Sequence, residues 1–348
     1  MHPSSQRVLT IQAPRQARLV DRPLARPGPG DVVIRSLYST FKHGTEMMAY
    51  LGRTPFASRV FDSTLRLFET APAQAAFYPR PMGSMVVGVV DWAGDDAGGL
   101  RAGEQVFAYA PIADVHVLPV GSVKRLGDLT PEQALCIDPA SFALGGVLDG
   151  AVAQKETVLV TGLGAIGLFA IQYCVARGAE VVAASSFEER RRLAQSFGAS
   201  EVYDTRLEGD IARTIKQRIG GVDAAIECSG SIATLALAIR SVRQCGRVVC
   251  VGFYGPADSG LILGEEFFHN RITLLASLPA LAWNNPVRGK QALYAKDLQE
   301  IAARDFCSGT ITVAGLFNPV VPFRDAVAAV ELVAAEPQRV VKVLLKHD

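Results

Sequence analysis

The chain has 348 residues, of which 49% are hydrophobic and 20% are charged. This composition is typical of a folded protein with room for two domains, and it excludes a disordered chain. The formal net charge of +1 gives no electrostatic reason to expect a nucleic acid or an anionic membrane as a partner.

No apolar stretch approaches the ~18 residues of a membrane span, and the N-terminal residues lack the apolar core of a signal peptide. We therefore expect a cytoplasmic protein that acts on a small molecule. The six cysteines form no C-x-x-C pair, so no zinc ribbon or redox dithiol is predicted.

The first ~140 residues predict short alternating strands separated by Pro and Gly, as in an antiparallel, barrel-like domain. The predicted strands are Arg7–Ile11, Asp31–Tyr38, Met85–Val90 and Gln105–Ala108.

From Thr157 onward, β-branched runs alternate with segments of helical length, which predicts a doubly wound parallel sheet. The runs are Val158–Val160, Glu180–Ala184, Glu201–Asp204, Val222–Cys228, Arg247–Phe253 and Ile272–Leu278.

After Leu278 we expect helices at Gly289–Asp305 and Arg324–Ala335 and a closing strand at Val340–Lys346. These elements are predicted to return to the first domain. The domains are then residues 1–141 with 279–348, and residues 142–278. The ligand site is expected in the cleft between them.

A glycine motif connects the first predicted strand of the second domain to a helical pattern. It reads Gly162-Leu163-Gly164-Ala165-Ile166-Gly167. The first glycine permits the turn, the second lets the backbone approach the phosphates, and the third lets the helix pack on the strand. In this context the motif predicts a dinucleotide cofactor on the helix N-terminus, and we favour a nicotinamide cofactor.

The end of the second predicted strand bears on the choice between NAD(H) and NADP(H). A carboxylate there would bind the ribose hydroxyls of NAD, whereas this strand ends in Ser185 and Ser186, with Arg190 following. Hydroxyls and a guanidinium suit a 2′-phosphate, so we favour NADP(H) over NAD(H). Alternatively, the arginines line a solvated helix face near Glu188 and Glu189. Further cofactor contacts are expected from Ser229, Gly252, Phe253, Ser277 and Lys342.

The chain resembles the medium-chain dehydrogenase/reductase superfamily over nearly its whole length. The resemblance rests on the glycine motif and on the segments Gly44-Thr45-Glu46, Gly83 to Val90, Gly103 to Phe107 and Val341 to Leu344. It implies a GroES-like β-rich catalytic domain, a six-stranded Rossmann domain and an NAD(P)-dependent oxidoreductase. We also expect a homodimer.

The resemblance breaks at the zinc ligands. Where zinc alcohol dehydrogenases carry Cys-Gly-Thr/Ser-Asp, this chain reads His43-Gly44-Thr45-Glu46, and Ser84 replaces the histidine of Gly-His-Glu. The third ligand position falls near Asp138, and no cysteine lies between Trp92 and Leu135 to form a structural zinc lobe. We therefore predict no zinc. This variant most resembles the zinc-lacking branch related to bacteriochlorophyllide dehydrogenases and assorted biosynthetic oxidoreductases.

Without zinc, side chains must polarise the carbonyl and move a proton, and the catalytic candidates are Thr45, His43 and Glu46. Thr45 matches the hydroxyl of the family's proton relay, His43 replaces a lost thiolate, and Glu46 could orient either. Alternatively, Thr45 caps the following helix, His43 is hydrogen-bonded filler, and Glu46 pairs with an arginine at the domain interface. Ser84 and Asp138 are weaker candidates for substrate contact.

The segment between Glu46 and Gly83 is rich in aromatic residues, including Phe61 and Phe68. We expect these to line a pocket or lid for a bulky, largely apolar or ring-containing biosynthetic alcohol or ketone. The alternative is a helical hairpin whose aromatics are buried. Two other functions stay open: a zinc-free enoyl or quinone reductase that reduces a conjugated double bond, and a non-catalytic dinucleotide sensor or scaffold.

Overall fold

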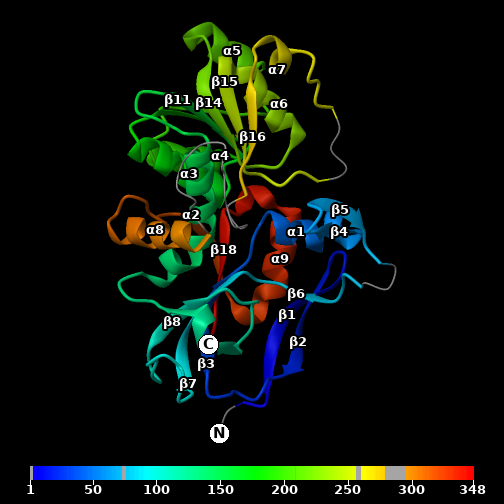
Figure 1. The fold of residues 1–348 in the computed structure, drawn as a ribbon, viewed down its shortest axis with the longest axis vertical. Helices are drawn as coiled ribbons and strands as arrows, with labels where there is room; N and C mark the ends of the chain where they lie inside the picture. The colour runs from blue at the N-terminus through cyan, green and yellow to red at the C-terminus, as the bar shows by residue number, and fades with distance from the viewer. Residues whose placement is uncertain (1–2, 73–75, 208, 256–259, 279–294) are drawn as a thin grey trace. The chain divides into compact units, whose positions relative to one another are not determined.

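The computed structural model describes residues 3–72, 76–207, 209–255, 260–278 and 295–348 (Figure 1). The chain divides into two compact units, the first formed by Met1–Leu135 with Phe317–Asp348 and the second by Cys136–Leu316. The discontinuous first domain expected from the sequence thus has a counterpart, but with different limits. The boundary falls inside helix α2 (Pro131–Asp149), and helix α8 (Ala295–Cys307) belongs to the second unit and not to the first.

The first unit is built mainly from antiparallel strands, as its alternating sequence predicts, although β17 and β18 pair in parallel. Its larger sheet has the order β10-β8-β7-β3-β18-β17, with β9 also paired to β3, and a smaller sheet has the order β2-β1-β6. The strands of the larger sheet are β3 (Asp31–Thr40), β7 (Met85–Ala93), β8 (Gln105–Ala108), β9 (Val115–Pro119), β10 (Val123–Arg125), β17 (Phe317–Pro322) and β18 (Lys342–Lys346). Those of the smaller sheet are β1 (Ser5–Ala13), β2 (Gln16–Pro23) and β6 (Arg80–Pro81).

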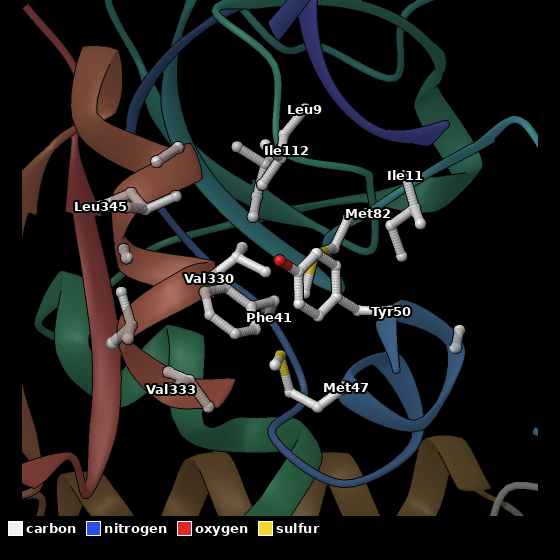
Figure 2. Close-up of a cluster of buried hydrophobic side chains, with 14 of the residues drawn as sticks. Leu9, Ile11, Phe41, Met47, Tyr50, Met82, Ile112, Val330, Val333 and Leu345 are labelled. Atoms are coloured by element: carbon white, nitrogen blue, oxygen red, sulfur yellow. The ribbon is translucent and has the colours of Figure 1, made fainter. Parts of the chain in front are cut away.

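A buried apolar cluster joins the beginning and the end of the chain within the first unit. Figure 2 shows the Phe41 ring among Val330 and Val333 of helix α9 (Ala326–Ala335) and Tyr50 of helix α1 (Thr45–Tyr50). Phe41 is fully buried, so it anchors the segment that leads from β3 to α1. This segment carries His43 and the glycine before α1, and the cluster therefore fixes one side of the candidate site.

The aromatic segment after α1 contains a β-hairpin, so the helical part of the alternative is wrong, while Phe77 and Tyr78 pack against the buried cluster of the first unit, as that alternative expected of its aromatics. Strands β4 (Arg59–Asp62) and β5 (Leu67–Thr70) pair antiparallel with Phe61 opposite Phe68, and their ring centroids are 5.1 Å apart. Every residue of β5 is exposed. The hairpin therefore presents an apolar surface, a feature that is uncommon unless it has a use.

The second unit contains a six-stranded parallel sheet with the order β13-β12-β11-β14-β15-β16 (Figure 1). The order confirms the predicted doubly wound sheet, because β12 and β13 lie on one side of β11 while β14, β15 and β16 lie on its other side. The strands are β11 (Thr157–Thr161), β12 (Glu180–Ala184), β13 (Glu201–Tyr203), β14 (Val222–Glu227), β15 (Val242–Cys250) and β16 (Thr273–Ala276). The central strand β11 is almost wholly buried, as expected for a strand covered on both faces.

Helices follow these strands in alternation. They are α3 (Ala165–Ala176), α4 (Glu188–Ser196), α5 (Ile211–Ile219), α6 (Ile232–Ser241) and the short α7 (Glu266–His269). Helix α8 occupies the later part of the helix expected over Gly289–Asp305, whose beginning lies outside the described residues. Across the ranges that the structure describes, no helix combines the length and apolar character needed to cross a membrane.

Candidate active site and cofactor site

In the first unit, three segments that lie far apart in the sequence are hydrogen-bonded together at the end of β3. The Thr40 hydroxyl donates to the Val343 carbonyl over 2.6 Å, and the Ser84 N–H donates to the Thr40 carbonyl over 3.1 Å. The end of β3, the start of β7 and strand β18 therefore bring His43, Glu46, Ser84 and Lys342 into one polar cluster. We call these four residues the first-unit cluster.

His43 is held by the backbone of β18. Its Nε2 accepts a hydrogen bond from the Val343 N–H over 3.2 Å, and its ring packs against Phe41 with centroids 5.0 Å apart. Because Nε2 is the acceptor, the neutral imidazole carries its proton on Nδ1. Protonation of Nε2 would break the bond to Val343.

Glu46 ties two loops of the first unit together, and the alternative of an arginine partner at the domain interface stays a prediction. One carboxylate oxygen accepts from the Lys42 N–H and the other from the Gly83 N–H, both over 2.6 Å. Burial raises the pKa of Glu46, while these two hydrogen bonds oppose that rise. Glu46 therefore fixes the loop that carries His43 to the residue before Ser84.

The remaining first-unit candidates differ in exposure. Thr45 is exposed and begins α1 after the N-cap residue Gly44, so it does not cap the helix. Ser84 and Lys342 are buried, and the Lys342 ammonium donates to the Phe41 carbonyl over 3.4 Å. The positive charge of Lys342 also opposes the raised pKa of Glu46. Lys342, predicted as a cofactor contact, thus lies beside the catalytic candidates of the first unit.

The donor set around His43 does not fit a catalytic zinc ion. Zinc sites use thiolate, imidazole or carboxylate ligands, whereas here a serine hydroxyl stands at position 84 and the His43 Nε2 is occupied by the Val343 N–H. In the described ranges, no three His, Cys, Asp or Glu side chains are grouped so that they could hold a metal ion.

In the second unit, the glycine loop has the geometry that its sequence predicts. Gly162 has a φ of +76°, and a Cβ there would lie 2.3 Å from the Ser229 backbone nitrogen. A Cβ on Gly167 would lie 2.3 Å from the Gly162 carbonyl oxygen, whereas none of the surrounding atoms lies within 4 Å of a Cβ on Gly164. The outer glycines are therefore required by packing, while Gly164 at the N-terminus of α3 leaves open space for a ligand.

A buried carboxylate, not singled out from the sequence, organises the neighbouring loops. Glu227 ends β14 and is fully buried. One oxygen accepts from the Ser229 N–H over 2.7 Å, from the Ser229 hydroxyl and from the Thr234 hydroxyl over 3.0 Å. The other accepts from the Gly230 N–H over 3.1 Å and the Tyr254 hydroxyl over 2.6 Å. Glu227 thus links the loops after β14 and β15, and the sequence signal for it was an acidic residue at the end of an apolar strand.

The other predicted cofactor residues lie at the same carboxyl edge of the sheet. The Gly252 N–H donates to the Glu227 carbonyl over 2.9 Å, and the Ser277 N–H donates to the Cys250 carbonyl over 2.9 Å. The Ser277 hydroxyl is buried and has no hydrogen-bond partner among the described residues. Phe253 is partly exposed next to Gly252. The structure therefore brings these residues together at the edge where ligands bind in this fold.

The predicted cofactor-selecting residues lie at the end of β12, together with residues that the sequence analysis missed. The Ser185 hydroxyl is buried and accepts from the Phe187 N–H over 3.2 Å. The Arg190 guanidinium lies over the Phe187 ring at 4.6 Å, and burial lowers its pKa to about 10. Arg206, from the loop after β13, donates to the Ser186 carbonyl. The end of β12 is therefore rich in guanidinium groups.

Three weaker candidates belong to other elements. Asp138 is buried within α2, in the second unit, where its backbone carbonyl accepts from the Ser141 hydroxyl. Phe61 and Phe68 pack against each other in the β4–β5 hairpin, and Phe68 is 43% exposed. Their contact with a substrate stays a prediction.

The chain is similar to known dehydrogenases. Residues 165–283 match the family described as zinc-binding dehydrogenase. The chain is 30% identical over 329 residues to D-guloside 3-dehydrogenase of Escherichia coli K12, covering 91% of this chain and 93% of that one. It is 28% identical over 272 residues to L-threonine 3-dehydrogenase of Pyrococcus furiosus, covering 68% and 73%.

Solved structures share the fold at lower identity. A candidate zinc-binding dehydrogenase of Sinorhizobium meliloti 1021, bound to NADP, superposes with a TM-score of 0.77 at 19% identity, covering 99% of this chain and 100% of that one. The same values hold for 2R,3R-butanediol dehydrogenase of Bacillus subtilis. These likenesses establish an α/β fold with a Rossmann unit and a GroES-like β-rich unit.

Proposed function

Because the chain belongs to the medium-chain dehydrogenase/reductase family and is an oxidoreductase of the alcohol and polyol dehydrogenase type, we propose a zinc-independent, NADP(H)-dependent reaction. In this reaction a hydride passes between the cofactor and the alcohol or carbonyl group of a bulky, ring-containing substrate. The observation that carries the proposal is the first-unit cluster, a set of hydrogen-bonded residues where zinc-dependent relatives would need metal ligands.

The residues of the second unit fit a nicotinamide dinucleotide. The open space at Gly164 and the N-terminal amides of α3 suit a pyrophosphate, and the loops held by Glu227 form the adjacent sheet edge. The guanidiniums near Ser185 support a preference for NADP(H). The NADP in the Sinorhizobium neighbour indicates that this fold accommodates the phosphorylated cofactor.

The bound cofactor supplies a nicotinamide ring that exchanges hydride with the carbinol carbon of the substrate. In our proposal the Nδ1–H of His43 donates a hydrogen bond to the substrate oxygen and stabilises negative charge there. Thr45, exposed at the start of α1, transfers the hydroxyl proton between substrate and water. Glu46 keeps both groups in place through Lys42 and Gly83.

The absence of thiolates at the former ligand positions supports zinc independence. The family match covers residues 165–283 and so does not include His43, Ser84 or Asp138. We place the chain in the zinc-lacking branch that resembles bacteriochlorophyllide dehydrogenase-related enzymes. The homodimer and the cytoplasmic location expected from the sequence stay predictions.

The substrate proposal combines the hairpin with the names of the relatives. D-Guloside 3-dehydrogenase and L-galactonate-5-dehydrogenase are named for sugar-derived alcohols. The exposed apolar side chains of the β4–β5 hairpin favour a ring-containing substrate with an apolar portion. A secondary alcohol on a ring satisfies both observations, and a glycoside with an apolar aglycone is one such compound.

The test measures hydride transfer with purified protein after exhaustive chelation. Ring-containing alcohols and ketones, short aliphatic alcohols and conjugated enones are each assayed with NADP(H) and NAD(H), and zinc is measured by elemental analysis. We expect turnover of a ring-containing alcohol or ketone with NADP(H) and no stoichiometric zinc. Activity that requires zinc, reduction of enones alone, or no transfer at all would contradict the proposal.

The variant His43→Phe tests the role of the imidazole. Loss of the Nδ1 donor should lower kcat by about 10²- to 10⁴-fold, the usual size of such a contribution, while cofactor binding is retained. The matched control is His269→Asn, because His269 is exposed in the second unit. Equal activity of the two variants would exclude a catalytic role for His43.

A further inference from the structure

The hydrogen bond that holds His43 crosses the seam between β3 and β18. His43 lies shortly after the end of β3, and the Val343 N–H that donates to its Nε2 over 3.2 Å belongs to β18. The two strands pair antiparallel, with Leu345 opposite Ser39. Because backbone N–H groups point alternately to the two sides of a strand, a shift of β18 by one residue would turn the Val343 N–H away from His43. The geometry at His43 therefore depends on what fixes this seam.

Two neighbouring side chains of β3 tie this seam together. Near His43, the Thr40 hydroxyl donates to the Val343 carbonyl over 2.6 Å. Farther along the seam, the Nε2 of His347 is 2.8 Å from the Ser39 hydroxyl, and the His347 N–H donates to the Leu37 carbonyl over 2.9 Å. Strand β18 and the residue that follows it are therefore attached to β3 at two separate points.

The His347 ring has one hydrogen-bonding role that its surroundings allow. The ring is buried and stacks on Phe323, with centroids 4.4 Å apart and an interplanar angle of 20°. Its Nδ1 is buried and has no hydrogen-bond partner among the described residues. A proton on Nδ1 would be an unsatisfied donor away from water, which is costly, so the neutral ring carries its proton on Nε2. In this tautomer the Nε2–H donates to the Ser39 hydroxyl.

We propose that His347 is a positioning residue that sets the tautomer of His43 through the seam between β3 and β18. The bond from His347 to Ser39 holds β18 in the register in which the Val343 N–H meets the His43 Nε2. That contact leaves the His43 proton on Nδ1. The importance of this tautomer for the reaction rests on the proposed function, in which the Nδ1–H of His43 donates to the substrate oxygen.

Thr40 offers the competing interpretation, because its hydroxyl contacts Val343 directly. A bond at one point restrains the position of a strand but lets the strand pivot, whereas the second point at His347 prevents this. Strand β17, on the other side of β18, gives less restraint near Val343, because its register shifts where two of its residues oppose Lys342. The geometry therefore favours a requirement for both attachments to β3.

The test observes His43 directly by nuclear magnetic resonance, since the nitrogen chemical shifts of a histidine distinguish a protonated ring nitrogen from a bare one. The His43 signals are assigned by their loss in His43→Phe. In the wild type we expect a bare Nε2 and a protonated Nδ1. His347→Ala and Ser39→Ala each remove the bond across the seam, so each should give a mixture of the two tautomers. His347→Gln keeps an N–H donor toward Ser39 and should restore the wild-type signals.

Steady-state kinetics of the same variants give a second readout. In His347→Ala we expect kcat to fall by about 10- to 10²-fold with little change in KM, as for a reacting group that is displaced without loss of substrate binding. His347→Gln should recover most of this loss. The matched control is Lys346→Ala, because Lys346 is exposed at the end of β18, and it should leave both the His43 signals and kcat unchanged.

The outcomes separate this inference from the proposed function. Unchanged His43 signals in folded His347→Ala and Ser39→Ala would overturn the inference, and so would a protonated Nε2 on His43 in the wild type, a result that needs no variant. An equal change in His347→Gln and His347→Ala would also overturn it, because the seam would then depend on the stacked ring and not on the bond to Ser39. If the tautomer changes as expected while kcat does not, the inference holds and the catalytic role of His43 in the proposed function fails.

Discussion

Two buried histidines of the first unit should make its stability depend on pH. The Nε2 of His116, on β9, is 3.2 Å from the Ser36 hydroxyl, and the Nε2 of His347, after β18, is 2.8 Å from the Ser39 hydroxyl. The His347 ring also stacks on Phe323 at 4.4 Å. Burial lowers the pKa of His116 to about 4, and burial, followed by the charge of His116, lowers that of His347 to about 3. Both imidazoles are therefore neutral in the folded unit.

The sign follows from the order of the pKa values. The unfolded histidines titrate near 6.5, above their folded values, so between these limits the unfolded chain binds more protons. The free energy of unfolding is therefore highest above pH ~6.5, and it decreases as the pH falls toward the folded pKa values. At pH 5, about 1.5 units below the unfolded pKa, each histidine lowers the free energy of unfolding by about 2 kcal/mol, and the pair lowers it by roughly 4 kcal/mol.

The assay is urea unfolding at pH 7.5 and pH 5.0, followed by circular dichroism. The double variant His116→Gln/His347→Gln keeps polar groups near the serines but does not titrate, so it should lose about 4 kcal/mol less than the wild type over this pH range. His269→Gln is the control, since His269 is exposed. An unchanged pH dependence in the double variant would refute the reasoning. So would nuclear magnetic resonance titration of His116 and His347 near pH 6 in the folded wild type, a measurement that needs no variant.

Three further predictions concern the proposed site. Gly162→Ala should prevent stable folding of the second unit, because the φ of Gly162 is positive and a Cβ would lie 2.3 Å from a neighbouring backbone nitrogen. Gly164→Ala should leave Tm unchanged in thermal melting but weaken cofactor binding in a titration. Glu227→Gln places an amide N–H₂ against hydroxyl and N–H donors, so it should lower the free energy of unfolding by roughly 1–3 kcal/mol and weaken cofactor binding. Unchanged binding would show that Glu227 has only a structural role. Replacing Phe61 and Phe68 with alanine should raise KM for a ring-containing substrate far more than it lowers Tm, and loss of stability alone would identify the hairpin as scaffold.

The sequence by itself determined the elements of the fold and the dinucleotide loop. The β-branched runs became β11 to β16 because a strand covered on both faces needs a continuous apolar run, and this requirement is local. The glycine motif could be interpreted from spacing because turn, close approach and helix packing all act within a few residues. The missing thiolate at position 43 and the missing imidazole at position 84 were likewise visible without a structure.

Only the tertiary structure decided how the site residues are held. The Val343 N–H that fixes the His43 tautomer lies 300 positions away, and the Arg206 guanidinium reaches Ser186 because β12 and β13 are neighbours. It also decided that the aromatic segment is a hairpin and that α8 packs with the second unit. Such contacts depend on strand order and register, which no local sequence pattern specifies. Every distant segment carries the same backbone N–H groups, so the sequence around a side chain does not indicate which of them will donate to it.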